Sequence, residues 1–140
     1  MNLDYISGFF DADGCITMTK GAKTDLFRTI KIDFTNTKLE ILLEIQKFLL
    51  DNYGLKLSIS TKPAKSEKHQ ISYTLSSASN RICYRLCQLL TSYHPMKKHR
   101  IAVVLKYHNQ VTKRNGKYND EEKVRKLAYE RLFFFTAFQQ

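Results

Sequence analysis

Two carboxylates close a short helical pattern near the start of the chain, in the segment YISGFFDADGCI at residues 5–16. The apolar spacing is helical as far as Ala12. Asp11 and Asp13 fall where that helix should end, with Gly14 expected as its left-handed cap. A helix C-terminus carries partial negative charge, so each acid there is misplaced by about 0.3–1 kcal/mol. We therefore expect a cation beside them, and a divalent metal held by oxygen ligands fits that chemistry.

The other residues of this helix predict how it packs. Gly8 and Ala12 lie four residues apart, a small-residue pair that lets two helix backbones approach closely. Ile6, Phe9 and Phe10 are left to face a core. The plain alternative is a short amphipathic helix with an exposed acidic end and an ordinary Asp-Gly turn. A close-packing face, a core face and an acidic tip in one segment favour the first interpretation.

The segment ISGFFDADG at residues 6–14 resembles the signature motif of the LAGLIDADG homing endonucleases. Five of its residues match the motif as they stand: Gly8, Asp11, Ala12, Asp13 and Gly14. The other four depart from it in ways that are common in this motif: Ile6, Ser7, Phe9 and Phe10. The motif occurs once, and the resemblance implies that single-motif members work as homodimers.

The resemblance also implies the residues of a catalytic site. Asp13 is expected to bind Mg²⁺, for which Mn²⁺ would substitute, helped by a backbone carbonyl such as that of Ala12. Asn36 matches a polar residue expected near the cut, where relatives carry the longer Gln. The homodimer is expected to form through one face of the motif helix, at Ser7, Gly8, Asp11 and Ala12.

A basic segment, PMKKHR at residues 95–100, begins a later helix. Cations there oppose the helix dipole, but a helix N-terminus with added Lys and Arg makes a good phosphate site. The resemblance places an active-site lysine near this point, with Lys97 as the best match and Lys98 as the alternative. A solvated basic turn is the plain interpretation that stays open beside it.

Composition limits the class of protein. A chain of 140 residues suits one domain, residues 1–140, with a real hydrophobic core. Its net charge of +10 is typical of a nucleic-acid binder, although a ribosomal or membrane-surface protein would share it. No apolar run reaches the roughly 18 residues of a membrane span. Asp4 stands where a signal peptide needs positive charge, so we expect an intracellular, non-secreted protein with no membrane partner.

The cysteines suit a reducing compartment. Cys15, Cys83 and Cys87 have no CxxC spacing. A zinc site made by Cys83 and Cys87 with His94 and His99 is conceivable, but we interpret these cysteines as small core residues.

Hydrophobic periodicity predicts an α+β domain. Alternation of period two predicts strands near 15–20, 29–35, 55–60 and 70–76, and helical spacing predicts helices near 37–52, 79–93, 97–111 and from 119 onward. A capping box is expected at Thr37 with Glu40, and Gly54 should end that helix. Asn119 with Glu122 is expected to open the last helix. The order is αββαββα followed by two more helices, with one antiparallel sheet, helices on one face and a bare polar face. The resemblance implies that this sheet is saddle-shaped.

The polar face of this sheet is the candidate DNA-reading surface. Every solvated sheet face is polar, but four such strands in a chain of charge +10 favour an antiparallel ribbon in a DNA major groove. Asp33 is the most telling residue, because a carboxylate among phosphates is costly unless it accepts a hydrogen bond, for example from a cytosine amino group. The residues expected to contact DNA are Thr17, Thr19, Lys20, Lys23, Arg28, Thr29, Lys31, Asp33, Thr35, Lys56, Ser58, Ser60, Lys62, Lys65, Lys68, Gln70, Ser72, Thr74, Lys98 and Arg100.

These observations favour a homodimeric, Mg²⁺-dependent endonuclease that cuts a long, near-palindromic site in double-stranded DNA. The resemblance implies cleavage of both strands across the minor groove, and the free-standing domain slightly favours an intron-encoded origin. No small-molecule substrate is expected. Two alternatives stay open: a LAGLIDADG-derived RNA-splicing maturase or non-catalytic binding protein, and a structural RNA-binding protein of ribosomal type.

Overall fold

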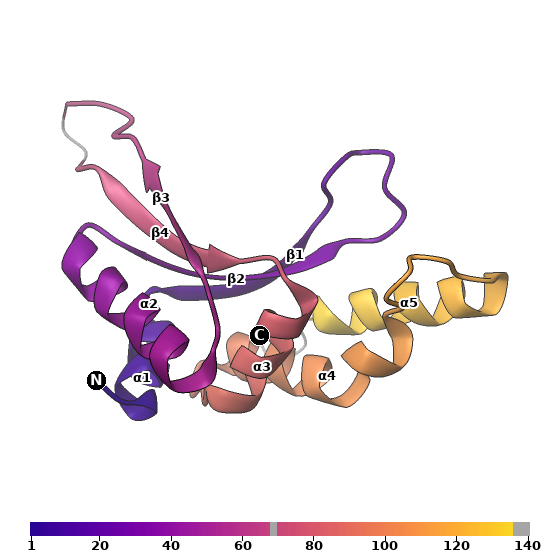
Figure 1. The fold of residues 1–140 in the computed structure, drawn as a ribbon. Helices are drawn as coiled ribbons and strands as arrows, with labels where there is room; N and C mark the ends of the chain where they lie inside the picture. Colours follow the sequence, from indigo (N-terminus) through magenta and orange to yellow (C-terminus); the bar gives the residue numbers. More distant parts are fainter. Residues whose placement is uncertain (68–69, 136–140) are drawn as a thin grey trace.

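The computed structural model describes residues 1–67 and 70–135. Its elements follow the predicted order, with two helices after the αββαββα unit (Figure 1). They are α1 (Leu3–Asp13), β1 (Gly14–Thr19), β2 (Thr29–Asn36), α2 (Leu39–Tyr53), β3 (Ser58–Lys62), β4 (Ser72–Ser77), α3 (Asn80–Leu89), α4 (Pro95–Val111) and α5 (Asp120–Phe133). The α+β class is therefore confirmed.

The four strands form one sheet in the order β1-β2-β4-β3, with all neighbours antiparallel. In Figure 1 the sheet is curved like a saddle: its two hairpins rise at opposite ends, and the helices lie below it. The upper, concave face carries no helix of the described chain. This arrangement follows from the alternation, because one side of each strand is apolar and must be covered.

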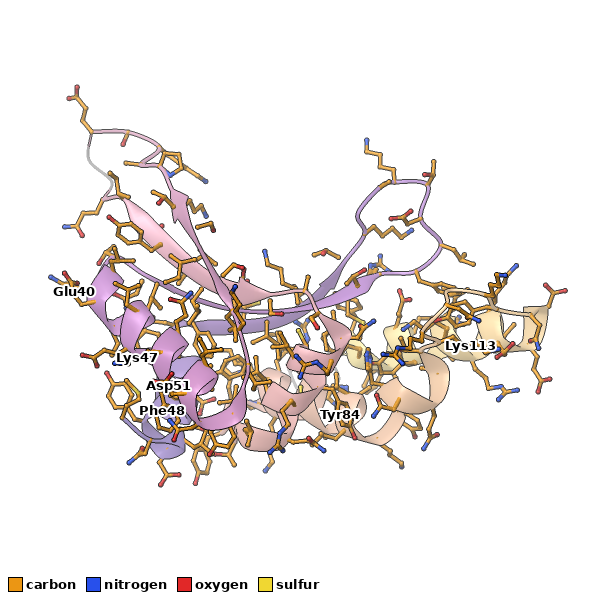
Figure 2. All side chains as sticks on the ribbon, viewed as in Figure 1. Glu40, Lys47, Phe48, Asp51, Tyr84 and Lys113 are labelled. Carbon is orange, nitrogen blue, oxygen red and sulfur yellow. The ribbon has the colours of Figure 1, made fainter. Side chains whose placement is uncertain are left out.

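The core lies between the sheet and the helices, where side chains fill the space below the strands (Figure 2). Ile30, Ile32 and Phe34 of β2 are buried there with the apolar side of α2. Cys83 and Cys87 also belong to this core, as predicted. Across residues 1–67 and 70–135, no group of three or more His, Cys, Asp or Glu side chains is placed to hold a metal. No helix in that part of the chain combines the length and apolarity needed to cross a bilayer.

Helix ends agree with the sequence in part. Gly54 ends α2 in the left-handed conformation, and Asn119 opens α5 as predicted, in a capping box with Glu122. The capping box expected at Thr37 is wrong, because Lys38 is the N-cap of α2 and makes no side-chain cap bond. The helix expected over 79–93 ends at Leu89, so an extended connection leads from α3 to α4.

Candidate active site and nucleic-acid interface

Helix α1 ends just before Gly14, but not because this glycine adopts the predicted left-handed conformation. Helix α1 continues to Asp13, and Gly14 is extended with φ −97°, so the left-handed cap is wrong. A Cβ on Gly14 would lie 2.2 Å from Phe10 Cδ2 and 2.7 Å from the Phe10 carbonyl oxygen. Glycine is therefore required by close approach, and the chain passes from helix to strand directly after Asp13.

Asp13 and Asn36, two of the predicted catalytic residues, lie in contact. Asn36 is the last residue of β2, and its Nδ2 donates to Asp13 Oδ2 at 3.0 Å. The Asn36 Oδ1 accepts from the Lys38 N–H at 2.8 Å, which fixes the amide. The Asp13 side chain is exposed, so its second carboxylate oxygen is open to a ligand.

Lys97 is the cation expected at the acidic end of α1. Although it is only 7% exposed, its Nζ donates to the carbonyl oxygens of Phe10 and Asp11, both at 2.9 Å. An ammonium there offsets the negative end of the helix dipole. Lys98 is exposed on α4. The geometry therefore assigns Lys97, not Lys98, to the end of the motif helix.

Asp11 is bound to the connection between α3 and α4. Its carboxylate accepts hydrogen bonds from the Ser92 hydroxyl and from the Tyr93 N–H, the latter at 2.9 Å. Burial would raise the pKa of Asp11, but these hydrogen bonds and the charge of Lys97 hold the pKa below its ordinary value. Asp11 is thus a charged carboxylate whose two oxygens both accept hydrogen bonds from the connection between α3 and α4.

One face of α1 is open. Gly8 and Ala12 are both exposed, and a Cβ on Gly8 would meet nothing within 4 Å. Ser7 differs from them, because it is buried and its hydroxyl accepts from the Thr91 N–H at 3.1 Å. We therefore remove Ser7 from the expected dimer interface, together with Asp11, whose carboxylate is bound to Ser92 and Tyr93, and retain Gly8 and Ala12.

The polar residues of the strands share the concave face, as the alternation predicts. Thr35 pairs with Thr74, which pairs with Ser60, and the two threonine hydroxyls lie 3.2 Å apart. Antiparallel partners point to the same side of a sheet. The predicted DNA-contacting residues within the strands of this face are Thr17, Thr19, Thr29, Lys31, Asp33, Thr35, Ser58, Ser60, Lys62, Ser72 and Thr74.

Two further residues of this face were missed. Cys15 and Ser76 both pair with Asp33, one from each side. The alternation that selected their neighbours passes through both of them, and that signal could have found them. Burial raises the pKa of Asp33 against the opposing charges of Lys31 and Lys97, so this carboxylate is poorly solvated.

The chain matches the family model of the LAGLIDADG-like domain over residues 1–91. It belongs to this family. Comparison with curated proteins gives no match.

Solved structures of homing endonucleases share the fold. The archaeal intron-encoded homing endonuclease I-Vdi141I, complexed with DNA, is 17% identical with a TM-score of 0.64, over 93% of this chain and 80% of that chain. The homing endonuclease I-CvuI, in complex with its target in the presence of Ca, is 17% identical with a TM-score of 0.59. I-CvuI with the I-CreI target in the presence of Mg is 18% identical with a TM-score of 0.56. Each I-CvuI alignment covers 96% of this chain and 83% of the other.

Two arginines predicted to contact DNA have other partners. Arg28 lies on the helix side of β2, where its backbone N–H and Nη1 donate to the Glu130 carboxylate, each at 3.3 Å. Arg100 Nη1 donates to the Ile16 carbonyl at 2.7 Å, and its guanidinium lies 4.9 Å from the Phe133 ring centroid. Both tie the C-terminal helices to the LAGLIDADG sheet, so we remove them from the DNA-contacting set.

The remaining predicted contacts lie outside the strands. Lys20, Lys23 and Lys65 are exposed on the hairpin loops. Lys56 and Gln70 are exposed just before β3 and β4, which begin later than predicted. Lys68 lies outside the described residues. The basic segment is no phosphate site as a whole, because Lys97 and Arg100 bind backbone carbonyls.

The end of the LAGLIDADG helix offers oxygen ligands. A free carboxylate oxygen of Asp13, next to backbone carbonyls at a helix C-terminus, is the donor chemistry that Mg²⁺ prefers. The residues present therefore fit a hard divalent cation. One copy of the chain supplies a single carboxylate at this point, which is too few ligands for a complete site.

Proposed function

We propose that the chain is a site-specific DNA endonuclease that works as a homodimer on a long, near-palindromic duplex. The observation that carries the proposal is the contact between Asp13 and Asn36 at the tip of α1, with Lys97 at the same helix end. The structural neighbours named as homing endonucleases in complex with DNA support this activity.

The open face of α1 supports the proposed homodimer. Packing two copies through Gly8 and Ala12 would bring two Asp13 carboxylates together, one for each strand of DNA. A two-fold interface is self-complementary, and its symmetry matches a near-palindromic target. The concave sheet faces of the two copies would then form one extended surface for base reading.

Each residue of the site has a distinct role in phosphodiester hydrolysis. When bound, Mg²⁺, or Mn²⁺ in its place, would supply an activated water and neutralise phosphate charge. Asp13 and the Ala12 carbonyl would hold it. Asn36 orients the Asp13 carboxylate and a water beside it. Lys97 uses two of its three N–H donors on Phe10 and Asp11, and the third is left for a phosphate oxygen.

A selection from randomised duplex DNA tests the proposal. We expect the protein to enrich one near-palindromic site and to cut both strands in Mg²⁺, with no cutting in excess chelator. Light scattering should give twice the chain mass of 16.4 kDa. Group I intron RNA, offered in parallel, separates a splicing role from DNA cleavage. A site that is bound but uncut in Mg²⁺ and Mn²⁺ contradicts the proposal.

Gly8→Leu tests the interface separately. A Cβ at Gly8 would meet no described atom within 4 Å and the position is exposed, so the single chain should still fold. The two α1 helices would be pushed apart, and cleavage should be lost. Ala102→Leu, on the exposed side of α4, is the matched control. A fully active monomer, or a Gly8→Leu variant that still dimerises and cuts, contradicts the assigned interface.

A further inference from the structure

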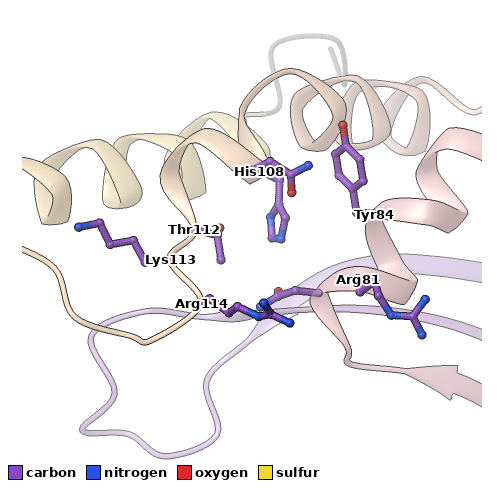
Figure 3. A pocket seen from close by; sticks show the side chains of 8 residues that line it. Arg81, Tyr84, His108, Thr112, Lys113 and Arg114 are labelled. Carbon is purple, nitrogen blue, oxygen red and sulfur yellow. The ribbon is translucent and has the colours of Figure 1, made fainter.

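A hollow lined by polar residues lies away from Asp13, between the start of α3 and the end of α4. It has a volume of about 380 Å³ and is shown in Figure 3. Besides two asparagines, its lining residues are Arg81, Tyr84, His108, Thr112, Lys113 and Arg114. None of the described lining residues is acidic, so the hollow is unsuited to a cation and suited to an anion.

His108 forms the buried wall of this hollow, and one of its ring nitrogens has no hydrogen-bond partner among the described residues. The residue is 2% exposed, its Nδ1 lies 2.8 Å from the Tyr129 hydroxyl, and its buried Nε2 makes no hydrogen bond to residues 1–67 or 70–135. Figure 3 shows the ring directed into the space bordered by Arg81 and Arg114.

The hydrogen bond to Tyr129 determines which ring nitrogen of His108 carries the proton. Among the described residues, the Tyr129 hydroxyl has Nδ1 as its only acceptor, so we assign the O–H as the donor in this bond. Burial and the charge of Lys126 lower the pKa of His108 to about 4, so the ring is neutral at pH 7. Its single proton is then on Nε2, which makes Nε2–H a donor with no acceptor. An unpaired buried donor is costly unless a ligand accepts from it.

Further donors surround the same space. Arg81 and Arg114 are exposed and bring two guanidinium groups, whereas Lys113 forms an ion pair with Glu122. The Thr112 Oγ1 accepts from the buried Lys126 Nζ at 2.6 Å, so its own hydroxyl proton is free to donate.

The first turn of α3 adds the positive end of a helix dipole. Ser79 Oγ caps the helix by accepting from the Ile82 N–H at 3.3 Å. The N–H groups of Asn80 and Arg81, the first two residues of α3, have no acceptor within the helix. Helix N-termini of this kind bind phosphate groups.

We propose that this hollow is a phosphate-binding site, distinct from the Asp13 site. Donors from α3, α4 and the residues after α4 converge on it, and a tetrahedral phosphate can accept from several directions at once. The group belongs either to a free phosphomonoester or to a nucleic-acid strand, since both present the same oxygens. The proposal does not depend on DNA cleavage.

An NMR titration tests it through the His108 ring. With histidine labelled by ¹⁵N, inorganic phosphate is added to the full chain at constant ionic strength, kept with NaCl. The expected result is a saturable shift of the His108 Nε2–H resonance, assigned with His108→Gln. Arg81→Ala with Arg114→Ala, both at exposed positions, should weaken binding at least about tenfold. Lys47→Ala removes an exposed charge from α2, far from the hollow, and should leave affinity unchanged (Figure 2).

Two further ligands distinguish the sources of the phosphate. A nucleoside 5′-monophosphate presents a free phosphomonoester, and an unphosphorylated single-stranded oligonucleotide presents internal diesters alone. Saturable binding of either ligand, weakened by the double arginine variant, supports the site and identifies its source. The proposal is overturned if phosphate gives no saturable shift at His108, or if the double variant binds it as tightly as Lys47→Ala does.

Discussion

Asp11 and Asp13 stand two residues apart in the last turn of α1, and their surroundings differ completely. Asp11 faces the connection from α3 to α4, which donates hydrogen bonds from Ser92 and Tyr93. Asp13 faces the end of β2, receives one hydrogen bond from Asn36 and is otherwise exposed. The first carboxylate holds the fold together, and the second is left with an open ligand position.

This difference shows that residue type alone does not assign a catalytic role. The role of each carboxylate depends on which segment of the chain packs against it. Variants on the two sides of α1 should therefore separate the stability of the fold from its activity.

The end of α1 should tolerate no side chain at Gly14. We expect Gly14→Ala to lower the unfolding free energy by about 3 kcal/mol, because the new Cβ would overlap the Phe10 carbonyl and ring. Gly8→Ala, where the space is open, should not lower the unfolding free energy and should raise it by up to about 1 kcal/mol through helix propensity. Denaturant unfolding measures both. Equal losses at the two glycines would show that close approach at Gly14 is not the constraint.

Lys97 stabilises the end of α1, as Asp11 does, and is also a predicted catalytic residue. Lys97→Met should cost about 1.5–3 kcal/mol of unfolding free energy, because two charge-assisted hydrogen bonds to backbone carbonyls are lost. Lys98→Met, at the adjacent exposed position, is the control and should change stability by less than about 0.5 kcal/mol. If both variants are equally stable, the buried ammonium does not hold the end of α1.

Asp11→Ala should lower the unfolding free energy at pH 7 by about 1 kcal/mol through loss of its hydrogen bonds. The pKa of Asp11 is lowered in the folded chain, so its contribution is present above the ordinary value of 3.8 and lost as pH falls. The variant should therefore show a flatter decline in stability with acid. Asp51→Ala, at an exposed carboxylate in the last turn of α2, should retain the wild-type decline.

Asp33, like Asp11, lies near Lys97, but its effect on stability should depend on pH in the opposite direction. Because its pKa is raised by burial, its contribution favours folding below pH 3.8 and is lost as pH rises through the folded pKa. Asp33→Asn should therefore raise the unfolding free energy at pH 7 by about 0.5 kcal/mol. A decrease at pH 7 would mean that attraction to Lys31 and Lys97 outweighs burial.

The sequence contained the order of elements and the polar face, because both depend on local periodicity. Arg28, one residue before β2, was predicted to contact DNA, whereas its partner is Glu130 in a distant helix. Contacts between distant segments had no local signal. Arg100 binds the carbonyl of Ile16, and nothing in either segment predicts that pairing.

The error at Ser7 has a similar physical origin. The sequence predicted a helix over 79–93, whereas α3 ends at Leu89 and the following residues contact α1. Their N–H groups bind Ser7 and Asp11, which covers a side of α1 that the sequence left open. The roles of Asp13, Asn36 and Lys97 were inferred from the motif and from spacing, and they remain predictions about catalysis.

Cleavage of the selected duplex in Mg²⁺, at equal DNA occupancy, tests the division between the two carboxylates most directly. Asp13→Asn keeps the size of the side chain but removes the charge, so cleavage should fall by orders of magnitude while DNA affinity is unchanged. Asp11→Ala, assayed at a temperature where it is folded, should retain cleavage within about tenfold of the wild type. Wild-type cleavage by Asp13→Asn, or an equal loss in both variants, would contradict the account.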